Sequence, residues 1–406
     1  MSRATPLDLD LPVWWLERIH FTFHPVRIVT PPDSPADQEC PVLSAPAVSL
    51  RDFALGQLHN LLRAVGLARS AESASKLLAQ ALGPGSGLPL SAVPHWPSHV
   101  ADDHTPVEFS VALARNEPPT VRMIVESLAE RPDHRANLAA ALDALAAFST
   151  EHALDLGRLD RVRDLFLPAD PQGAFAFWYS LIVGPGPSPA IKVYLNPDVR
   201  GRENATPLVR EALDRLGLSA AYPSIAGHAL RREGLDRFSF FALDLADSDR
   251  ARVKTYVSHD DAVVADVVRA ASAVPDADPG LLADVVELAC GGTGPFTRRP
   301  LMSSYTFLSG DVDTPSGYSL YLPVRDYVQD DLEACERVLA VMTRCGLDTK
   351  PFVLALTSIV QRPLGEGVGL IAHVSLRLGK PRPGVTVYLS SEAYDVTPPR
   401  TTALSV

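Results

Sequence analysis

The stretch AIKVYLNP, residues 190–197, alternates apolar and polar side chains in the way that a β-strand requires. Neighbouring side chains of a strand point to opposite faces, so Lys192 and Tyr194 share one face and the aliphatic residues beside them form the other. The stretch therefore predicts a strand with one apolar face and one face that carries cations and phenols.

This pattern, a polar or basic residue two positions before a tyrosine, recurs along the chain. It reads ARVKTYVS at 251–258, YSLYLPV at 318–324 and GVTVYLSS at 384–391, with a degenerate copy, TVRMIVES, at 120–127. The anchors at 124, 194, 256, 321 and 388 lie 62 to 70 residues apart, which is too even for scatter and too long for a solenoid repeat. Each copy follows another strand-like run, the first being VEFSVALA at 107–114, so we predict five β-hairpins.

The segments between the hairpins have apolar residues at helical spacing, as in ANLAAALDALAAFS at 136–149. Ten antiparallel strands can avoid exposed edges by closing into a barrel, and their apolar faces then need a cover of helices. The predicted fold is α+β: a ten-stranded antiparallel β-barrel of five repeated ααββ-type units, with helices outside and the active site in the lumen. We expect this barrel to span 46–406 and residues 1–45 to form an N-terminal extension of unknown role.

Composition limits the classes of partner. The formal net charge of −11 argues against a nucleic-acid-binding protein, so any positive site must be local and enclosed. No run approaches the roughly 18 apolar residues that a membrane span needs. The four cysteines form no CxxC pair and the first residues do not resemble a signal peptide, so we expect a cytoplasmic protein with reduced thiols.

The repeated segments resemble the aromatic prenyltransferases of the ABBA or PT-barrel type, specifically the dimethylallyl tryptophan synthase group with its bacterial indole prenyltransferases. DDHTPVEFS at 102–110 is similar to the family's acidic block, and the five anchored segments are similar to its successive lumen strands. The resemblance covers roughly residues 50–395. It implies an enzyme of secondary metabolism, such as alkaloid biosynthesis, that transfers a dimethylallyl group from dimethylallyl diphosphate to the indole of L-tryptophan. It further implies C6 as the favoured position and no cofactor or obligatory metal.

An allylic diphosphate ionises only if the leaving group is neutralised, and arginine and lysine both suit phosphate oxygens. Such cations would replace a magnesium clamp, for which the sequence has no DDxxD motif. Tyrosine rings would attract the allyl cation, by about 0.5–2 kcal/mol each, and their hydroxyls can also bind the diphosphate. The predicted diphosphate-binding residues are Arg122, Lys192, Tyr194, Arg252, Lys254, Tyr256, Tyr321 and Tyr388.

Glu108 lies on the predicted lumen face of the first strand and, by resemblance, matches the family's indole-anchoring glutamate. Its carboxylate would accept the indole N–H and raise the electron density of the ring as the ring attacks. Some family members carry a lysine where this chain has residues 177–180, FWYS, so the final proton acceptor stays open.

A second group of cations and two other functions stay open. Arg377, Lys380 and Arg382 either reach the diphosphate or the amino-acid carboxylate, or are exposed turn residues. The same barrel could act on a tryptophan-containing cyclic dipeptide or on a phenolic acceptor. It could also be a non-catalytic barrel that binds a small ligand, in which case it would release no diphosphate.

Overall fold

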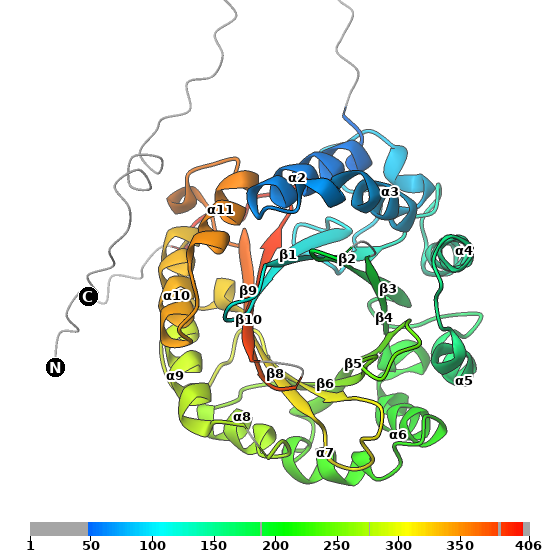
Figure 1. Ribbon diagram of the computed structural model, residues 1–406, viewed down its shortest axis with the longest axis vertical. Coiled ribbons are helices and arrows are strands. Elements are labelled where there is room, and N and C mark those ends of the chain that lie inside the picture. Colours follow the sequence, from blue (N-terminus) through cyan, green and yellow to red (C-terminus); the bar gives the residue numbers. More distant parts are fainter. Residues whose placement is uncertain (1–47, 187–188, 276, 381–382, 401–406) are drawn as a thin grey trace, which may run out of the picture.

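The computed structural model describes residues 48–186, 189–275, 277–380 and 383–400. Seen along its axis, it is a closed ring of strands with a ring of helices around it (Figure 1). This confirms the predicted fold class. The extension expected at 1–45 lies outside the described residues, and so does Arg382. The boundary at residue 46 therefore stays a prediction.

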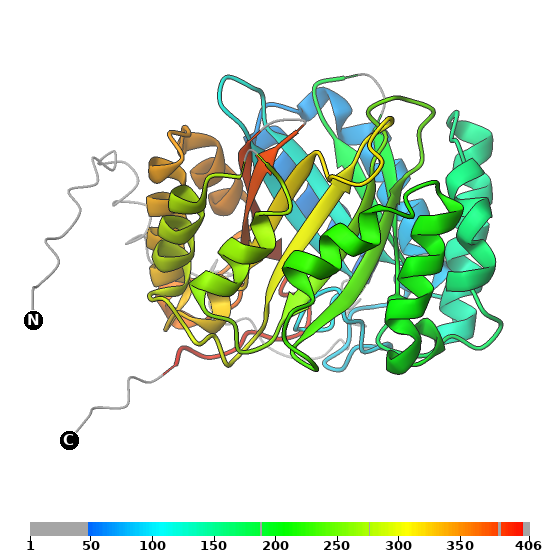
Figure 2. The same cartoon turned by 90° about the horizontal axis from the view of Figure 1, so that it is seen from below.

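The barrel wall contains ten strands, and each pairs with its neighbours in antiparallel fashion in the order β1-β10-β9-β8-β7-β6-β5-β4-β3-β2. Consecutive strands form five hairpins that lean together around the axis (Figure 2). The strands are β1 (Val107–Leu113), β2 (Thr120–Glu126), β3 (Phe177–Val183), β4 (Ala190–Leu195), β5 (Asp236–Asp244), β6 (Val253–His259), β7 (Leu301–Phe307), β8 (Gly317–Leu322), β9 (Ile371–Gly379) and β10 (Gly384–Ser390).

Two α-helices precede each hairpin, which gives the predicted five ααββ units. None of the described helices is long and apolar enough to cross a membrane. The helices are α2 (Leu50–Ala64), α3 (Ala71–Leu82), α4 (His134–Glu151), α5 (Gly157–Phe166), α6 (Ala205–Arg215), α7 (Ala221–Ala229), α8 (Val264–Ala271), α9 (Pro279–Cys290), α10 (Asp331–Arg344) and α11 (Lys350–Ile359).

The hydrophobic core fills the space between strands and helices, and α4 illustrates how the sequence builds it. Asp133 caps this helix by accepting a hydrogen bond from the backbone N–H of Ala136. The buried residues of α4 follow helical spacing, and among them Phe148 packs edge-on against Tyr179 of β3 at 5.4 Å between ring centroids. Since Tyr179 points outward, its neighbours Trp178 and Ser180 face the lumen.

A polar network crosses this outer layer between the barrel and α8. His259 Nδ1 lies 2.8 Å from a carboxylate oxygen of Asp236, and His259 Nε2 lies 2.9 Å from the hydroxyl of Ser303. That hydroxyl is bonded to Tyr318, which donates to the backbone carbonyl of Val267 in α8. The order of groups resembles a serine-protease triad, but His259 and Ser303 are 1% and 0% exposed. A substrate has no access to this serine, so the network is structural.

Candidate active site

Strand register sorts the lumen side chains toward two ends of the barrel. Glu108 comes at the start of β1, near the helical crossovers, whereas Ser110 lies further along toward the hairpin turn. On β2, Ile124 pairs with Glu108 and Arg122 pairs with Ser110. Arg122 is therefore closer to the hairpin turns, and Glu108 is closer to the crossovers. We call these regions the cationic end and the Glu108 end.

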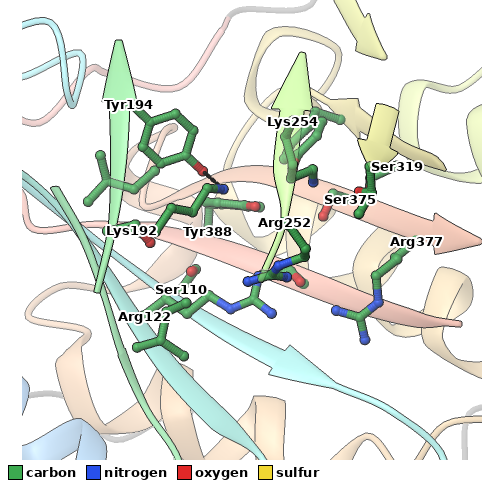
Figure 3. Close-up of a pocket in the computed structure, with 16 residues that line it drawn as sticks. Ser110, Arg122, Lys192, Tyr194, Arg252, Lys254, Ser319, Ser375, Arg377 and Tyr388 are labelled. Carbon is green, nitrogen blue, oxygen red and sulfur yellow. Dashed lines mark hydrogen bonds between the residues drawn. The ribbon is translucent and has the colours of Figure 1, made fainter. Parts of the chain in front are cut away.

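Basic side chains from several hairpins meet at the cationic end. Figure 3 shows the guanidinium groups of Arg122, Arg252 and Arg377 turned toward the same cavity. Lys192 and Lys254 line this cavity too, as predicted, together with serine and threonine hydroxyls. Hydroxyl and cationic donors together form a surface suited to phosphate oxygens. The hydroxyl groups belong to Ser110, Ser180, Thr306, Ser319, Ser375 and Thr386.

The two lysines are enclosed. Lys192 Nζ lies 3.0 Å from the hydroxyl oxygen of Tyr194 and 3.0 Å from that of Tyr256. Burial, together with the charge of Arg252, holds the pKa of Lys192 well below its usual range. Burial and the charge of Lys192 do the same to the pKa of Lys254. In the empty cavity both amines therefore lose their protons more readily than an exposed lysine does.

The sequence analysis missed Asp244, which contacts Arg252 of this cavity. Arg252 donates to its carboxylate through Nε at 2.6 Å and through Nη2 at 3.2 Å. Burial alone would raise the pKa of Asp244, but the charge of Arg252 outweighs burial and lowers it. Asp244 therefore fixes the direction of the Arg252 guanidinium before any ligand arrives.

The structure decides the open question about Arg377. It lies on β9 with its side chain toward the cavity, and burial followed by the charge of Arg122 lowers its pKa to about 10. Lys380 is exposed in the following turn, as the alternative held. The composition of the turn could not show that Arg377 faces the cavity while Lys380 is exposed, because this difference depends on where β9 ends.

A layer of tyrosines lies between the two ends and borders both. Ring centroids are 5.7 Å apart for Tyr194 and Tyr256, 5.7 Å for Tyr256 and Tyr321, and 6.0 Å for Tyr321 and Tyr388. The rings come from four different hairpins, as the repeated pattern predicted. This tyrosine layer offers aromatic faces and hydroxyl groups at the middle of the lumen.

Glu108 faces the lumen at the Glu108 end, as predicted, and is only 6% exposed. Burial, together with the charge of Asp102, raises the pKa of its carboxyl group to about 8. Trp178 and Phe240 supply an aromatic wall beside it, and Phe175 holds Trp178 by stacking at 4.0 Å. The end is therefore shaped for a flat aromatic ring with one buried carboxyl group at its edge.

The sequence analysis missed several polar residues of the Glu108 end. Arg299 precedes β7, Arg325 follows β8, and Asp102 lies in the loop before β1. His373 of β9 lines the same cavity, and burial with the charge of Arg299 lowers its pKa to about 3. No repeated spacing marks the loop residues, although Asp102 begins the acidic block DDHTPVEFS.

Comparison with known proteins agrees with this geometry. The family model described as tryptophan dimethylallyltransferase matches residues 71–351, which is more than half of the chain. The chain belongs to the tryptophan dimethylallyltransferase family. The resemblance inferred from the sequence is thereby confirmed.

Solved structures of this family superpose closely on the chain. A 6-dimethylallyl tryptophan synthase is 49% identical, with a TM-score of 0.83, covering 88% of this chain and 100% of its own. The 6-dimethylallyltryptophan synthase from Micromonospora olivasterospora, solved in complex with DMASPP and Trp, is 50% identical over 87% and 100%, with a TM-score of 0.83. The 5-dimethylallyltryptophan synthase from Streptomyces coelicolor is 36% identical over 86% and 99%, with a TM-score of 0.80.

Proposed function

We propose that this chain transfers a dimethylallyl group from dimethylallyl diphosphate to a ring carbon of free L-tryptophan, at C6, without a metal ion. The observation that carries this proposal is the division of the lumen. A cationic end and an end with one buried carboxyl group face each other across the tyrosine layer. A cytoplasmic location is part of the proposal and rests on the sequence alone.

The cationic end would promote departure of the diphosphate. As the bond between the allylic carbon and oxygen breaks, its electron pair leaves with the diphosphate, and fixed cations stabilise the growing charge. Arg122, Arg252 and Lys254 face the same cavity for this purpose, with Lys192 beside them. Because cations of the chain supply this neutralisation, the ionisation needs no magnesium ion.

The tyrosine layer would protect the allyl cation. Aromatic faces attract a cation and exclude water from it, while the phenol hydroxyls bind diphosphate oxygens. Tyr194, Tyr321 and Tyr388 border both ends and are placed to do both. The cation is then captured by the indole ring and not by water.

Glu108 would anchor and activate the acceptor. Its carboxylate accepts the indole N–H, which raises electron density on the ring as a ring carbon forms its bond to the allyl group. The proton on that carbon then passes to a base, either the Glu108 carboxylate or an oxygen of the released diphosphate, and the ring becomes aromatic again. The ionised form of Glu108 is therefore the active one.

The comparisons support C6 as the proposed position. The two 6-dimethylallyltryptophan synthases share 49% and 50% identity with this chain, whereas the 5-dimethylallyltryptophan synthase shares 36%. Since the indole is held at Glu108, the side chains around it decide which ring carbon faces the allyl cation. The greater identity supports the C6 geometry.

One incubation tests the proposal. Purified protein, dimethylallyl diphosphate and L-tryptophan are mixed in excess chelator, and the product is analysed by mass spectrometry and NMR. We expect 6-dimethylallyltryptophan and one diphosphate released per product. If product forms only with a cyclic dipeptide or a phenol, that compound and not L-tryptophan is the acceptor. If no diphosphate is released with any acceptor, the proposal is rejected.

A further inference from the structure

A further buried carboxyl group, that of Glu126, lies beside the cavity at the Glu108 end without lining it. Glu126 is the last residue of β2 and is 3% exposed. Its partner on β3 is Trp178, so the two side chains lie on the same inward face of the barrel wall. Trp178 lines the cavity and Glu126 does not. Glu126 is therefore covered by residues that form the cavity wall.

Ser98 joins Glu126 to the loop that precedes β1. Its hydroxyl donates to Oε2 of Glu126 at 2.6 Å, and Ser98 itself is fully buried. The next residues of the loop, His99 and Val100, line the cavity. His104 Nδ1 lies 3.1 Å from the backbone oxygen of Ser98, which closes the loop on itself. Glu126 thus anchors one part of the cavity wall.

Trp96 and Trp178 turn their indole N–H groups toward Glu126. Both indole nitrogens are buried, and within the described part of the chain neither makes a hydrogen bond of regular geometry. The N–H groups act on Glu126 all the same: burial raises the pKa of its carboxyl group to about 7, while the Ser98 hydroxyl and both indoles act in the opposite direction. A carboxylate has two oxygens and can accept from all three donors.

Glu126 adds a constraint on Trp178 that aromatic stacking does not supply. Phe175 stacks on the Trp178 ring with 4.0 Å between centroids and 23° between planes. A stacked ring can still turn or slide parallel to its partner, because stacking has little preference for direction within the plane. A contact from the ring nitrogen to a carboxylate removes that freedom. The two contacts together fix the edge that Trp178 presents to the cavity.

We infer that Glu126 is a positioning residue that sets the Trp178 ring, and through it the acceptor ring carbon that meets the allyl cation. This inference rests on the proposed function, because it requires an indole held at Glu108 beside Trp178. An indole held by its N–H can turn in its own plane, which exchanges one ring carbon for the next. The wall that Trp178 forms limits this turn. A tenfold preference between two carbons corresponds to only about 1.4 kcal/mol, so a small shift of the wall would admit a second product.

The composition of the product tests this role. Glu126→Gln keeps the size of the side chain but replaces one acceptor oxygen with an NH2 group, which repels an indole N–H. We expect the wild type to form one ring isomer almost entirely, and Glu126→Gln to form a second isomer as at least about one tenth of the product, with kcat/KM reduced less than about tenfold. Chromatography and NMR of the products provide the measurement.

A double-mutant cycle tests whether Glu126 acts through Trp178. Trp178→Phe keeps an aromatic ring but removes the N–H, so it should also produce the second isomer. Adding Glu126→Gln to Trp178→Phe should then change the composition no further. Glu130→Gln, at an exposed glutamate four residues along the chain, is the matched control and should behave as the wild type. Circular dichroism confirms folding, and Trp178→Phe tests the inference if Glu126→Gln does not fold.

Fluorescence reports on Trp178 without turnover. The protein is saturated with the unreactive dimethylallyl thiolodiphosphate, and the Trp178 emission is taken as the difference between each protein and its Trp178→Phe counterpart. Quenching of this emission by acrylamide should increase about twofold or more in Glu126→Gln, because the ring is held less firmly. Glu130→Gln should show the wild-type value.

An unchanged isomer composition in Glu126→Gln would overturn the inference, and a loss of rate with unchanged composition would do so too, since it would indicate a general effect on the fold. A further change of composition when Glu126→Gln is added to Trp178→Phe would show that Glu126 does not act through Trp178. A wild type that forms no prenylated tryptophan would contradict the proposed function instead. Acrylamide quenching would then still decide whether Glu126 holds Trp178.

Discussion

Lys192 Nζ on β4 lies 3.0 Å from the hydroxyl oxygen of Tyr256 on β6, across the intervening strand β5. The contact joins two different ααββ units, and it connects the cationic end to the tyrosine layer. A diphosphate that binds Lys192 must compete with this phenol for the same amine. Binding of the donor substrate should therefore rearrange both groups together.

Diphosphate binding should take up protons. Burial and neighbouring cations hold the pKa of both Lys192 and Lys254 well below its usual range. A bound polyanion offsets the charge of the neighbouring cations and therefore raises both pKa values. At pH 8 we expect net proton uptake when the thiolodiphosphate binds, measured by calorimetry in buffers of different ionisation enthalpy. Lys192→Met should reduce that uptake. A binding heat that is the same in every buffer would contradict this picture.

Glu108→Gln should lower kcat by about 100- to 10,000-fold, because the amide cannot act as a base toward the indole N–H. Affinity for the thiolodiphosphate should change less than about twofold, since Glu108 does not line the cationic end. Glu336→Gln, an exposed change on α10, is the matched control. Turnover of the Glu108 variant at the control rate would show that Glu108 has another role.

The pH profile should identify the active form of Glu108. Its pKa is raised to about 8, so the carboxyl group is protonated below that pH and ionised above it. If the ionised form accepts the indole N–H, kcat/KM should rise with pH and level off above about 8. In Glu108→Gln, kcat/KM should no longer rise with pH over this range. A profile that falls as pH rises from 6 to about 8 would mean that the protonated acid is required.

Removal of metal should leave the reaction intact. We expect activity in excess chelator within about twofold of the untreated rate, because the cations at the cationic end neutralise the leaving group. Initial rates with and without added magnesium provide the measurement. A complete loss that magnesium restores would assign the neutralisation to the metal.

The network behind β6 should contribute to acid stability. Burial alone would raise the pKa of Asp236, but hydrogen bonds from His259 and Arg232 lower it to about 2. The stabilisation is present above the unfolded pKa near 3.8 and is lost as pH falls toward 2. Asp236→Asn should cost about 3 to 5 kcal/mol at neutral pH and flatten this acid limb.

Urea unfolding at several pH values measures that cost. Asp247→Asn changes an exposed carboxylate in the loop after β5 and should behave like the wild type. Equal unfolding free energies for Asp236→Asn and Asp247→Asn would show that the Asp236 contacts contribute nothing to stability.

Much of the site could be predicted from the sequence, because the two-residue period of the strands shows which side chains share a face. The side chains of Lys192 and Tyr194 share a face because they are two residues apart, and five copies of this relation were enough to predict a common lumen. Asp244 could not be placed in the same way, because its pairing with Lys192 depends on the stagger of β5 against β4. Arg299 lies in a loop and Arg325 in the short 3-10 helix Val324–Asp326, and the two meet only after the barrel closes.

The roles of the two ends are tested most directly by the electron density of a crystal soaked with L-tryptophan and dimethylallyl thiolodiphosphate. We predict the diphosphate within hydrogen-bonding distance of Arg122, Arg252 and Lys254, with the indole nitrogen about 3 Å from a carboxylate oxygen of Glu108. The allyl group should lie against the tyrosine layer between them. A diphosphate bound at the Glu108 end, or an indole bound among the lysines, would contradict the account.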